Sequence, residues 1–269
     1  MISVRSLSFA YPGGRPIFSD FSWEVERGEA WAVLGPSGFG KSTLLNLLAG
    51  LRPPSAGEVR IDGEVIRRPR PRTGLVLQDF GLLPWATCEQ NVSLGLRIQG
   101  FYGPDGKHAP ASVSARNARE RTEYWLARLG LTTVRRQYPG QLSGGQRQRA
   151  AIARTLALEP DLLLMDEPFA SLDAPTRESL QNLALELRAE QKLTTVVVTH
   201  SIEEAAILGP KILLFGNGHG QGPGRGMEWI DNPSAGQAAY RGSADYHAMC
   251  DQLRERMGAG VEQGARVAG

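Results

Sequence analysis

Hydrophobic and polar residues alternate with a period of two through much of the first part of the chain. The alternation covers residues 2–9, 21–25 and 59–66 and is broken by glycine and proline. A period of two places every second side chain on one buried face. The pattern therefore predicts antiparallel strands.

Short uninterrupted apolar runs predict a second kind of strand. The run at residues 31–34 leads through a glycine-rich turn into a helical pattern at 41–49. Two further runs, at 162–165 and 194–199, flank the helical pattern of residues 174–190. This order of strand, helix and strand is typical of a parallel sheet, so an α/β core is predicted.

Residues 87–139 interrupt this order and are predicted to be helical. Thr87 and Gln90 form a capping-box pair at the start. Further along, Trp125, Leu126 and Leu129 are spaced as on a helix. The stretch at 92–98 is ambiguous, because its hydrophobic residues alternate with a period of two, as in a strand, whereas the preceding cap favours a helix.

Glycine-rich segments punctuate the rest of the chain. Residues 100–110 and 216–226 are predicted to be a surface loop and a flexible connection. The extension at 227–257 ends in a helix predicted to pack on the core through one apolar face, made of Tyr246, Met249, Cys250, Leu253 and Met257. Residues 258–269 are expected to be a disordered tail.

Composition narrows the possible functions. A chain of 269 residues with 41% hydrophobic residues suits one large domain with an insertion. Its net charge of +2 gives no reason to expect a polyanionic partner such as DNA. Two distant cysteines, Cys88 and Cys250, form no metal-ligand pattern and suit a reducing cytosol. The first ten residues do not resemble a signal peptide, and no apolar run approaches the roughly 18 residues of a membrane helix.

The segment Gly35-Pro-Ser-Gly-Phe-Gly-Lys-Ser-Thr43 joins the strand at 31–34 to the helix after it. It fits the pattern G-x-x-x-x-G-K-[ST], in which backbone N–H groups and the helix N-terminus bind phosphate oxygens. Lys41 is expected to reach the β and γ phosphates of a nucleotide, and Ser42 to bind Mg²⁺ through its hydroxyl. The alternative is an ordinary glycine-rich turn.

The strand in Leu162-Leu-Leu-Met-Asp-Glu-Pro168 ends in two carboxylates, at the edge where open α/β sheets place their ligands. Asp166 is expected to help position Mg²⁺ and Glu167 to orient or deprotonate the attacking water. A strand that runs into an acidic turn has the same residues. The glycine-rich loop at 35–43 favours the functional interpretation.

Leu142-Ser-Gly-Gly-Gln146 opens a predicted helix. Ser143 and Gln146 form a capping box, and two glycines leave bare N–H groups at the positive end of the helix dipole. This arrangement makes a second anion site. One domain with two phosphate sites and one nucleotide suggests that two copies of the chain face each other.

The pentapeptide LSGGQ at 142–146 lies 20 residues ahead of Asp166 and resembles the signature of the ABC ATPase family. The remaining parts of the family pattern are matched by Tyr11, Gln78, Asp173 and His200. The resemblance covers residues 1–215. It implies an α/β P-loop NTPase core with a parallel sheet, an N-terminal antiparallel β subdomain and an inserted α-helical subdomain.

The resemblance assigns roles to single residues. Tyr11 would stack on adenine, and His200 would contact the γ-phosphate. Gln78 would touch Mg²⁺ and sense a membrane partner, and Asp173 would cross a dimer interface. Each is also compatible with an ordinary surface or core position, and Tyr11 precedes a common turn sequence. The catalytic candidates are Glu167, His200 and Gln78. The Mg²⁺ candidates are Ser42, Gln78 and Asp166. The candidates for binding ATP are Tyr11, Gly35, Pro36, Ser37, Gly38, Gly40, Lys41, Ser42, Thr43, Ser143, Gly144, Gly145, Gln146 and Asp173.

The same resemblance implies an assembly, with ATP and Mg²⁺ as cofactors. A homodimer would hold each ATP between the 35–43 loop of one chain and residues 143–145 of the other. Two integral membrane permease subunits would dock near Gln78, and a solute-binding protein would act through them. The chain would lie peripherally on the cytoplasmic face of the inner membrane, with no nucleic-acid partner.

Residues 80–85 and 166–173 resemble bacterial importer ATPases, and the Leu-Leu-Pro-Trp sequence is most similar to the nitrate, sulfonate and taurine group. The chain departs from that group at residues 101–117, at 216–226 and at Phe39. The alternatives are an ABC exporter ATPase and a non-transport ABC ATPase that acts on nucleic acid or the ribosome. The latter usually carries coiled-coil inserts, zinc modules or two fused cassettes, and the sequence has none of these features.

Overall fold

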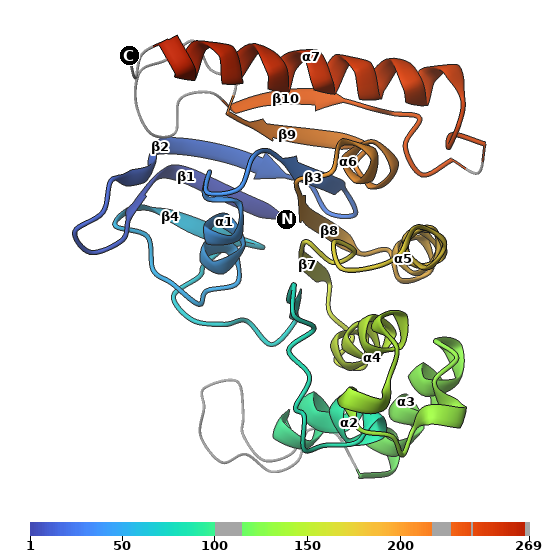
Figure 1. The fold of residues 1–269 in the computed structure, drawn as a ribbon. Coiled ribbons are helices and arrows are strands. Elements are labelled where there is room, and N and C mark those ends of the chain that lie inside the picture. The colour runs from blue at the N-terminus through green and yellow to red at the C-terminus, as the bar shows by residue number, and fades with distance from the viewer. Residues whose placement is uncertain (100–114, 217–226, 238, 267–269) are drawn as a thin grey trace. The chain divides into compact units, whose positions relative to one another are not determined.

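The computed structural model describes residues 1–99, 115–216, 227–237 and 239–266 (Figure 1). They fall into two compact units. The first unit contains residues 1–69 and 187–269, and the second contains residues 70–186. Most of the glycine-rich segments at 101–117 and 216–226 lies outside the described residues.

The first unit contains an antiparallel sheet with the strand order β2-β1-β4-β5. Its strands are β1 (Ile2–Ala10), β2 (Pro16–Val25), β4 (Ala56–Ile61) and β5 (Glu64–Val65). In β1 the alternation of buried residues skips one position between Val4 and Leu7. Ser6, at that point, has a positive φ of 46°, and the pairing with β2 shifts register there. The irregularity returns Leu7 to the buried face, and the predicted antiparallel strands are confirmed.

The same unit contains parallel strands. In it, β3 (Ala30–Leu34) lies between β8 (Thr194–Thr199) and β9 (Lys211–Phe215) and runs parallel to both. An added strand, β10 (Met227–Asp231), pairs antiparallel with β9. All residues of β3 and β8 are buried, as expected for parallel strands covered on both faces. Helices α1 (Lys41–Leu48) and α6 (Ile202–Leu208) follow β3 and β8 in the chain.

The C-terminal helix α7 (Ala244–Arg266) lies along β9 and β10 (Figure 1). Cys250 and Leu253 are buried in a cluster with residues of β3, β9 and α6, and the other residues of the predicted apolar face pack against it. The helix continues through residues 258–266, where the sequence predicted a disordered tail. Glycines in this part weaken the helix, but adding turns to a docked helix needs no new nucleation.

In the second unit, the short parallel strands β6 (Thr73–Val76) and β7 (Leu162–Asp166) pair with each other. Between them in the chain lie α2 (Cys88–Gln99), α3 (Ala115–Arg128), two 3₁₀ turns (Thr132–Val134 and Pro139–Gln141) and α4 (Gly144–Leu156). Helix α5 (Ala174–Gln191) begins in this unit and extends past its boundary. Packing contacts join α2 to both α3 and α4.

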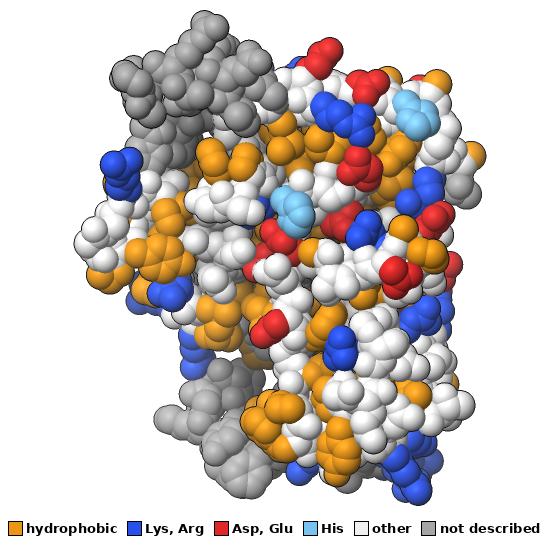
Figure 2. All heavy atoms as spheres, viewed as in Figure 1, with side chains coloured by type: hydrophobic (Ala, Val, Ile, Leu, Met, Phe, Trp, Pro, Cys, Tyr) orange, Lys and Arg blue, Asp and Glu red, His pale blue; other side chains and the backbone are white. Residues whose placement is uncertain are grey.

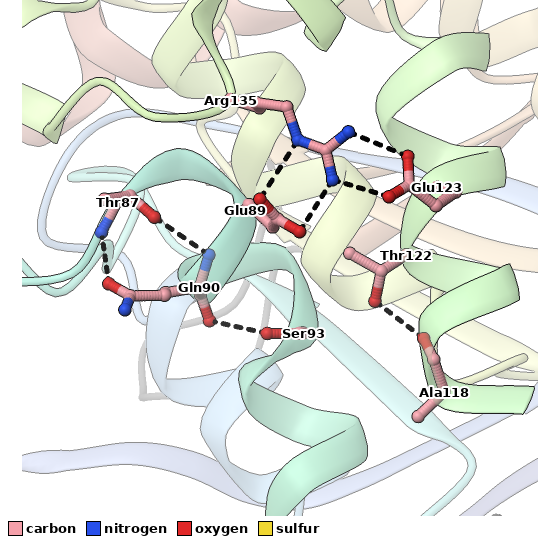
Figure 3. Close-up of polar contacts among 8 residues, drawn as sticks. All are labelled: Thr87, Glu89, Gln90, Ser93, Ala118, Thr122, Glu123 and Arg135. Atoms are coloured by element: carbon pink, nitrogen blue, oxygen red, sulfur yellow. Dashed lines mark hydrogen bonds and ion pairs between the residues drawn. The ribbon is translucent and has the colours of Figure 1, made fainter. Parts of the chain in front are cut away.

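The ambiguous stretch at 92–98 is helical and belongs to α2. Both halves of the predicted capping box are present: Thr87 N–H donates to Gln90 Oε1 at 2.9 Å, and Gln90 N–H donates to Thr87 Oγ1 at 3.3 Å (Figure 3). Val92 and Leu96, four residues apart, are buried, whereas Ile98 is exposed. The helical period therefore decides burial here, despite the alternation in the sequence.

Arg135 ties this helical insertion together (Figure 3). Its guanidinium donates two hydrogen bonds to Glu89 in α2 and two to Glu123 in α3, at 2.6 to 3.0 Å. These charge-assisted contacts raise the pKa of Arg135 and lower the pKa of Glu123. One side chain thus connects two helices to the segment that leads to the LSGGQ sequence.

Candidate functional site

The glycine-rich loop lies in the first unit, between β3 and α1. Gly38 and Gly40 have φ values of 87° and 90°, a conformation that glycine adopts without strain. Gly40 is the N-cap of α1, and no side chain caps the helix. The first turn therefore keeps backbone N–H groups and the positive end of its dipole for an anion.

Packing also demands glycine at two positions of this loop. A Cβ at Gly35 would lie 2.8 Å from the Cβ of Phe215, and a Cβ at Gly40 would lie 2.3 Å from Cγ2 of Ile17. Gly38 has open space around it, so only its backbone conformation favours glycine. The structural interpretation of a tight turn and the phosphate-binding interpretation are thus both compatible with these residues.

Lys41 is 5% exposed, and its ammonium donates to the carbonyl oxygens of Gly35 and Pro36, each at 2.8 Å. A buried ammonium group needs such acceptors, because burial without partners strongly disfavours its charge. Ser42, the next residue, is exposed at the start of α1. The loop thus holds a cation at its own backbone, and an exposed serine follows it.

Tyr11 lies beside this loop, as the resemblance implied. Its hydroxyl is 3.2 Å from the hydroxyl oxygen of Thr43, and its side chain keeps 36% exposure. The guanidinium of Arg52 lies over the ring, 5.0 Å from the centroid. Sequence reasoning missed Arg52. Because it covers one face of the ring, an adenine would have to stack on the other face or displace the guanidinium.

His200 is exposed directly after β8. Ser201 caps α6 by accepting from the N–H of Glu204 at 3.2 Å. The Glu204 carboxylate does not return to the backbone of Ser201 but accepts from the hydroxyl of Thr199 at 2.7 Å, and that hydroxyl accepts from the N–H of Ser201 at 3.0 Å. This arrangement fixes the backbone on both sides of His200.

The acidic pair lies in the second unit. Asp166 is the last residue of β7, and Glu167 follows with a positive φ of 44°, which is uncommon outside glycine. Gln78, after β6, donates from Nε2 to Oε2 of Glu167 at 3.4 Å. The structure thus brings together two catalytic candidates that are 89 residues apart.

The LSGGQ segment also lies in the second unit. Ser143 is the N-cap of α4 and forms the complete predicted capping box with Gln146, with hydrogen bonds of 2.9 and 3.2 Å. A Cβ at Gly145 would lie 2.6 Å from Cγ2 of Thr176. The start of α4 therefore packs closely on the start of α5. Packing alone accounts for glycine at this position.

Asp173 lies just before α5 and accepts from the N–H of Thr176 at 3.3 Å. Hydrogen bonds from the side chain and backbone of Thr176 lower the pKa of the Asp173 carboxyl, so it stays ionised at neutral pH. The glycine at 145 contacts the same threonine. Two candidate elements, residues 143–146 and Asp173, are thus neighbours within the second unit.

A hollow of about 720 Å³ opens beside α2 in the second unit. Hydrophobic side chains reach the surface in the part of the chain that contains α2 (Figure 2). Trp85 and Ile98 in its lining are 73% and 51% exposed. The remaining lining residues are Leu83, Ala86, Gln90, Leu94 and Arg97. Exposed large apolar side chains around a concave surface are typical of a protein-binding site. Sequence reasoning placed a partner near Gln78 and missed most of this lining.

Within the part of the chain that the structure describes, no group of three or more His, Cys, Asp or Glu side chains could hold a metal ion. Mg²⁺ bound with a nucleotide needs few protein ligands, because phosphates and water fill most of its positions. The hydroxyl of Ser42 and the carboxylate of Asp166 fit its preference for oxygen ligands. Across the described residues, no helix is both long enough and apolar enough to cross a membrane.

The first unit contains a strand, a glycine-rich loop and a helix without a side-chain cap. The second unit contains a strand that ends at Asp166 and is followed by Glu167. These features define a protein of the P-loop NTPase class. A family model described as ABC transporter matches residues 18–170, more than half of the chain. The chain belongs to this family. It is therefore an ABC-type ATPase that couples ATP hydrolysis to transport.

Individual relatives agree with this assignment. The chain is 40% identical over 228 residues to the taurine import ATP-binding protein TauB of Escherichia coli O157:H7, covering 85% of this chain and 83% of the relative. It is 46% identical over 211 residues to the protein of the same name from Pseudomonas aeruginosa, covering 78% and 76%.

Solved structures show the same fold. The ATP-binding cassette MJ0796, in a dimeric post-hydrolysis state bound to ADP and Pi, has a TM-score of 0.72 and 31% identity and covers 86% of this chain and 98% of that one. The cbiO1 protein of Clostridium perfringens, part of the cbiONQ transporter complex, has a TM-score of 0.72 and 28% identity and covers 87% and 88%. The predicted α/β P-loop NTPase fold is confirmed.

Proposed function

We propose that this chain is the ATP-hydrolysing subunit of a bacterial importer for taurine or a related small sulfonate. The observation that carries this proposal is the 40% to 46% identity to two taurine import ATP-binding proteins over most of both chains. The Leu-Leu-Pro-Trp sequence at 82–85 supports the same solute group.

In this proposal the candidate residues have the roles that the family resemblance implies. Lys41 and the N–H groups of the 35–43 loop bind the phosphates, and Tyr11 stacks on adenine. Ser42, Gln78 and Asp166 provide oxygen ligands for Mg²⁺, which would supply charge neutralisation when bound. Glu167 orients or deprotonates the attacking water, and His200 contacts the γ-phosphate.

Dimerisation completes the proposed site. Ser143, Gly144 and Gly145 of a second copy bind the γ-phosphate of the ATP held by the first, with Asp173 at the interface. The capped start of α4, with its two glycines, supports this role. ATP then holds two chains together, and loss of the γ-phosphate contacts after hydrolysis lets them separate.

The hollow beside α2 is the proposed docking site for a membrane permease subunit. Its apolar lining begins at Leu83, five residues after Gln78 in the chain. A partner seated there would therefore contact a segment close in sequence to Gln78, one of the proposed catalytic residues. In this proposal the chain lies peripherally on the cytoplasmic face of the inner membrane. A solute-binding protein delivers the solute from the other side.

Uptake by the reconstituted complex tests the solute. The chain, its membrane subunits and its solute-binding protein would be placed in vesicles that contain ATP and Mg²⁺, and entry of radiolabelled taurine would be measured. We expect uptake that unlabelled taurine competes away and nitrate does not, and that the Glu167→Gln complex loses. Uptake of nitrate without uptake of taurine would contradict the proposed solute. Outward movement of taurine would contradict the proposed direction of transport.

A further inference from the structure

The turn that follows Gln78 has an unusual backbone. Phe80 and Gly81 are consecutive residues with positive φ values, 66° and 56°. Such a conformation is uncommon for phenylalanine and persists only where surrounding contacts enforce it. A Cβ at Gly81 would lie 3.2 Å from a guanidinium nitrogen of Arg154, so the turn is closely packed against that side chain.

Two arginines of α4 hold this turn. Arg154 donates from Nη1 to the carbonyl oxygen of Gly81 at 2.5 Å and from Nη2 to that of Phe80 at 3.0 Å. The guanidinium of Arg147 lies 5.5 Å from the centre of the Phe80 ring and donates to the carbonyl oxygen of Leu142 at 2.8 Å. Seven residues separate the two arginines, which places them on one face of the helix.

The contact with Arg154 is a strong constraint on the turn. Burial lowers the pKa of its guanidinium, and the charge of Asp79 acts in the opposite direction. A half-buried guanidinium needs its acceptors, and here two of them are the carbonyls of the left-handed residues. Arg147 connects the same turn to the backbone at the start of the LSGGQ segment.

We propose that Arg147 and Arg154 are positioning residues for Gln78. They fix the turn at Phe80 and Gly81 to α4, and the turn directs the Gln78 amide toward Glu167. The inference rests on the proposed roles of Gln78 and Glu167 in hydrolysis. Its consequence is that Gln78 and the LSGGQ segment are tied to one helix, so a displacement of α4 also moves Gln78.

Steady-state hydrolysis by an Arg154→Lys variant tests the proposal. Lysine keeps the charge but lacks the planar fork that reaches both carbonyls. We expect kcat to fall about tenfold while KM for ATP stays within about twofold, because the substitution leaves the phosphate-binding loop at 35–43 unchanged. The matched control is Arg149→Lys on the same helix. Arg149 bonds to Leu129 and Ser179 instead, and its variant should keep the wild-type rate.

A double-mutant cycle separates positioning from general destabilisation. If Arg154 acts through Gln78, then the Gln78→Ala/Arg154→Lys variant should hydrolyse ATP no slower than Gln78→Ala alone. If the two losses multiply, the positioning role is overturned and the proposed function stands. If Gln78→Ala keeps the wild-type kcat, both the positioning role and the proposed role of Gln78 are overturned.

A second variant covers the case in which Arg154→Lys does not fold. Phe80→Leu removes the ring beneath Arg147 and leaves α4 intact. We expect a loss of about threefold in kcat, again absent on top of Gln78→Ala. A wild-type rate for a folded Arg154→Lys, or for Phe80→Leu where the lysine variant does not fold, would overturn the proposal.

Discussion

At the scale of single residues, the hydrogen bond between Gln78 and Glu167 joins two of the proposed catalytic residues. Glu167 has a left-handed backbone that the sequence does not predict, and its carboxylate accepts from a glutamine that is distant in sequence. The neighbouring Asp166 completes β7 in ordinary geometry. Two adjacent acidic residues are thus given different backbone environments, as their different proposed roles require.

Glu167→Gln removes the proposed base and keeps the shape of the side chain. We expect hydrolysis to slow by roughly 10²-fold or more, because the amide cannot accept a proton from water. Phosphate release in single-turnover conditions measures this directly. Near-normal release would remove Glu167 from the catalytic role.

Gln148 in α4 gives a prediction about stability. Its side chain is completely buried, and among the described residues neither amide atom has a hydrogen-bond partner. Gln148→Met keeps the length and removes the polar atoms, so the free energy of unfolding should rise by about 1 kcal/mol in urea titration. Gln146→Met is the contrasting variant, because it breaks the capping box with Ser143 and should lower stability. A loss of stability in Gln148→Met would contradict the prediction.

At the scale of elements, the insertion between β6 and β7 depends on local caps and on one arginine. The Thr87 cap starts α2 where the apolar alternation indicated a strand. Arg135 then joins α2 and α3, although it lies in neither helix. Helix identity is therefore a local property, while the arrangement of the helices depends on contacts between distant residues.

Arg135→Met should loosen this insertion without moving the proposed catalytic residues. Because the ion pairs are partly exposed, we expect a decrease in Tm of about 2 to 4 °C, measured by calorimetry at neutral pH. Arg135 lowers the pKa of Glu123 from its ordinary 4.5, so the pair stabilises the fold fully above that pH and loses its effect as pH falls through the lowered value. The difference between variant and wild type should therefore vanish in acid. A pH-independent difference would show that packing of the arginine stem, and not charge, is responsible.

At the scale of the whole molecule, the chain combines the two compact units with an extension that is part of the first. Helix α7 buries Cys250 and Leu253 against β3, β9 and α6, so the extension contributes to the core of the first unit. Burial raises the pKa of both cysteine thiols, to about 11 at Cys88, which keeps them protonated at neutral pH.

At this scale, we predict that the chain forms a dimer only when ATP is bound. Glu167→Gln with ATP should elute as a dimer in size-exclusion chromatography with light scattering, and as a monomer with ADP, because the trapped γ-phosphate holds two chains together. Adding Ser143→Arg should abolish the dimer while a fluorescent ATP analogue still binds, since the bulky side chain blocks the proposed phosphate site of the partner. A dimer that forms equally with ADP would contradict this mechanism.

The sequence by itself determined the class of this protein. Local signals sufficed for the loop at 35–43, the capped helix after Ser143 and the acidic strand end at Asp166, because each depends on residues that are close in the chain. The same holds for the antiparallel strands, whose period of two was confirmed.

Only the tertiary structure decided which distant residues meet. Arg52 over Tyr11, Gln78 on Glu167 and Arg154 on the turn after Gln78 each join segments far apart in the chain, and no periodicity records such pairs. Tertiary structure also decided that the helix begun at residue 244 continues to 266, because docking of its apolar face nucleates a helix that its glycines alone would not favour.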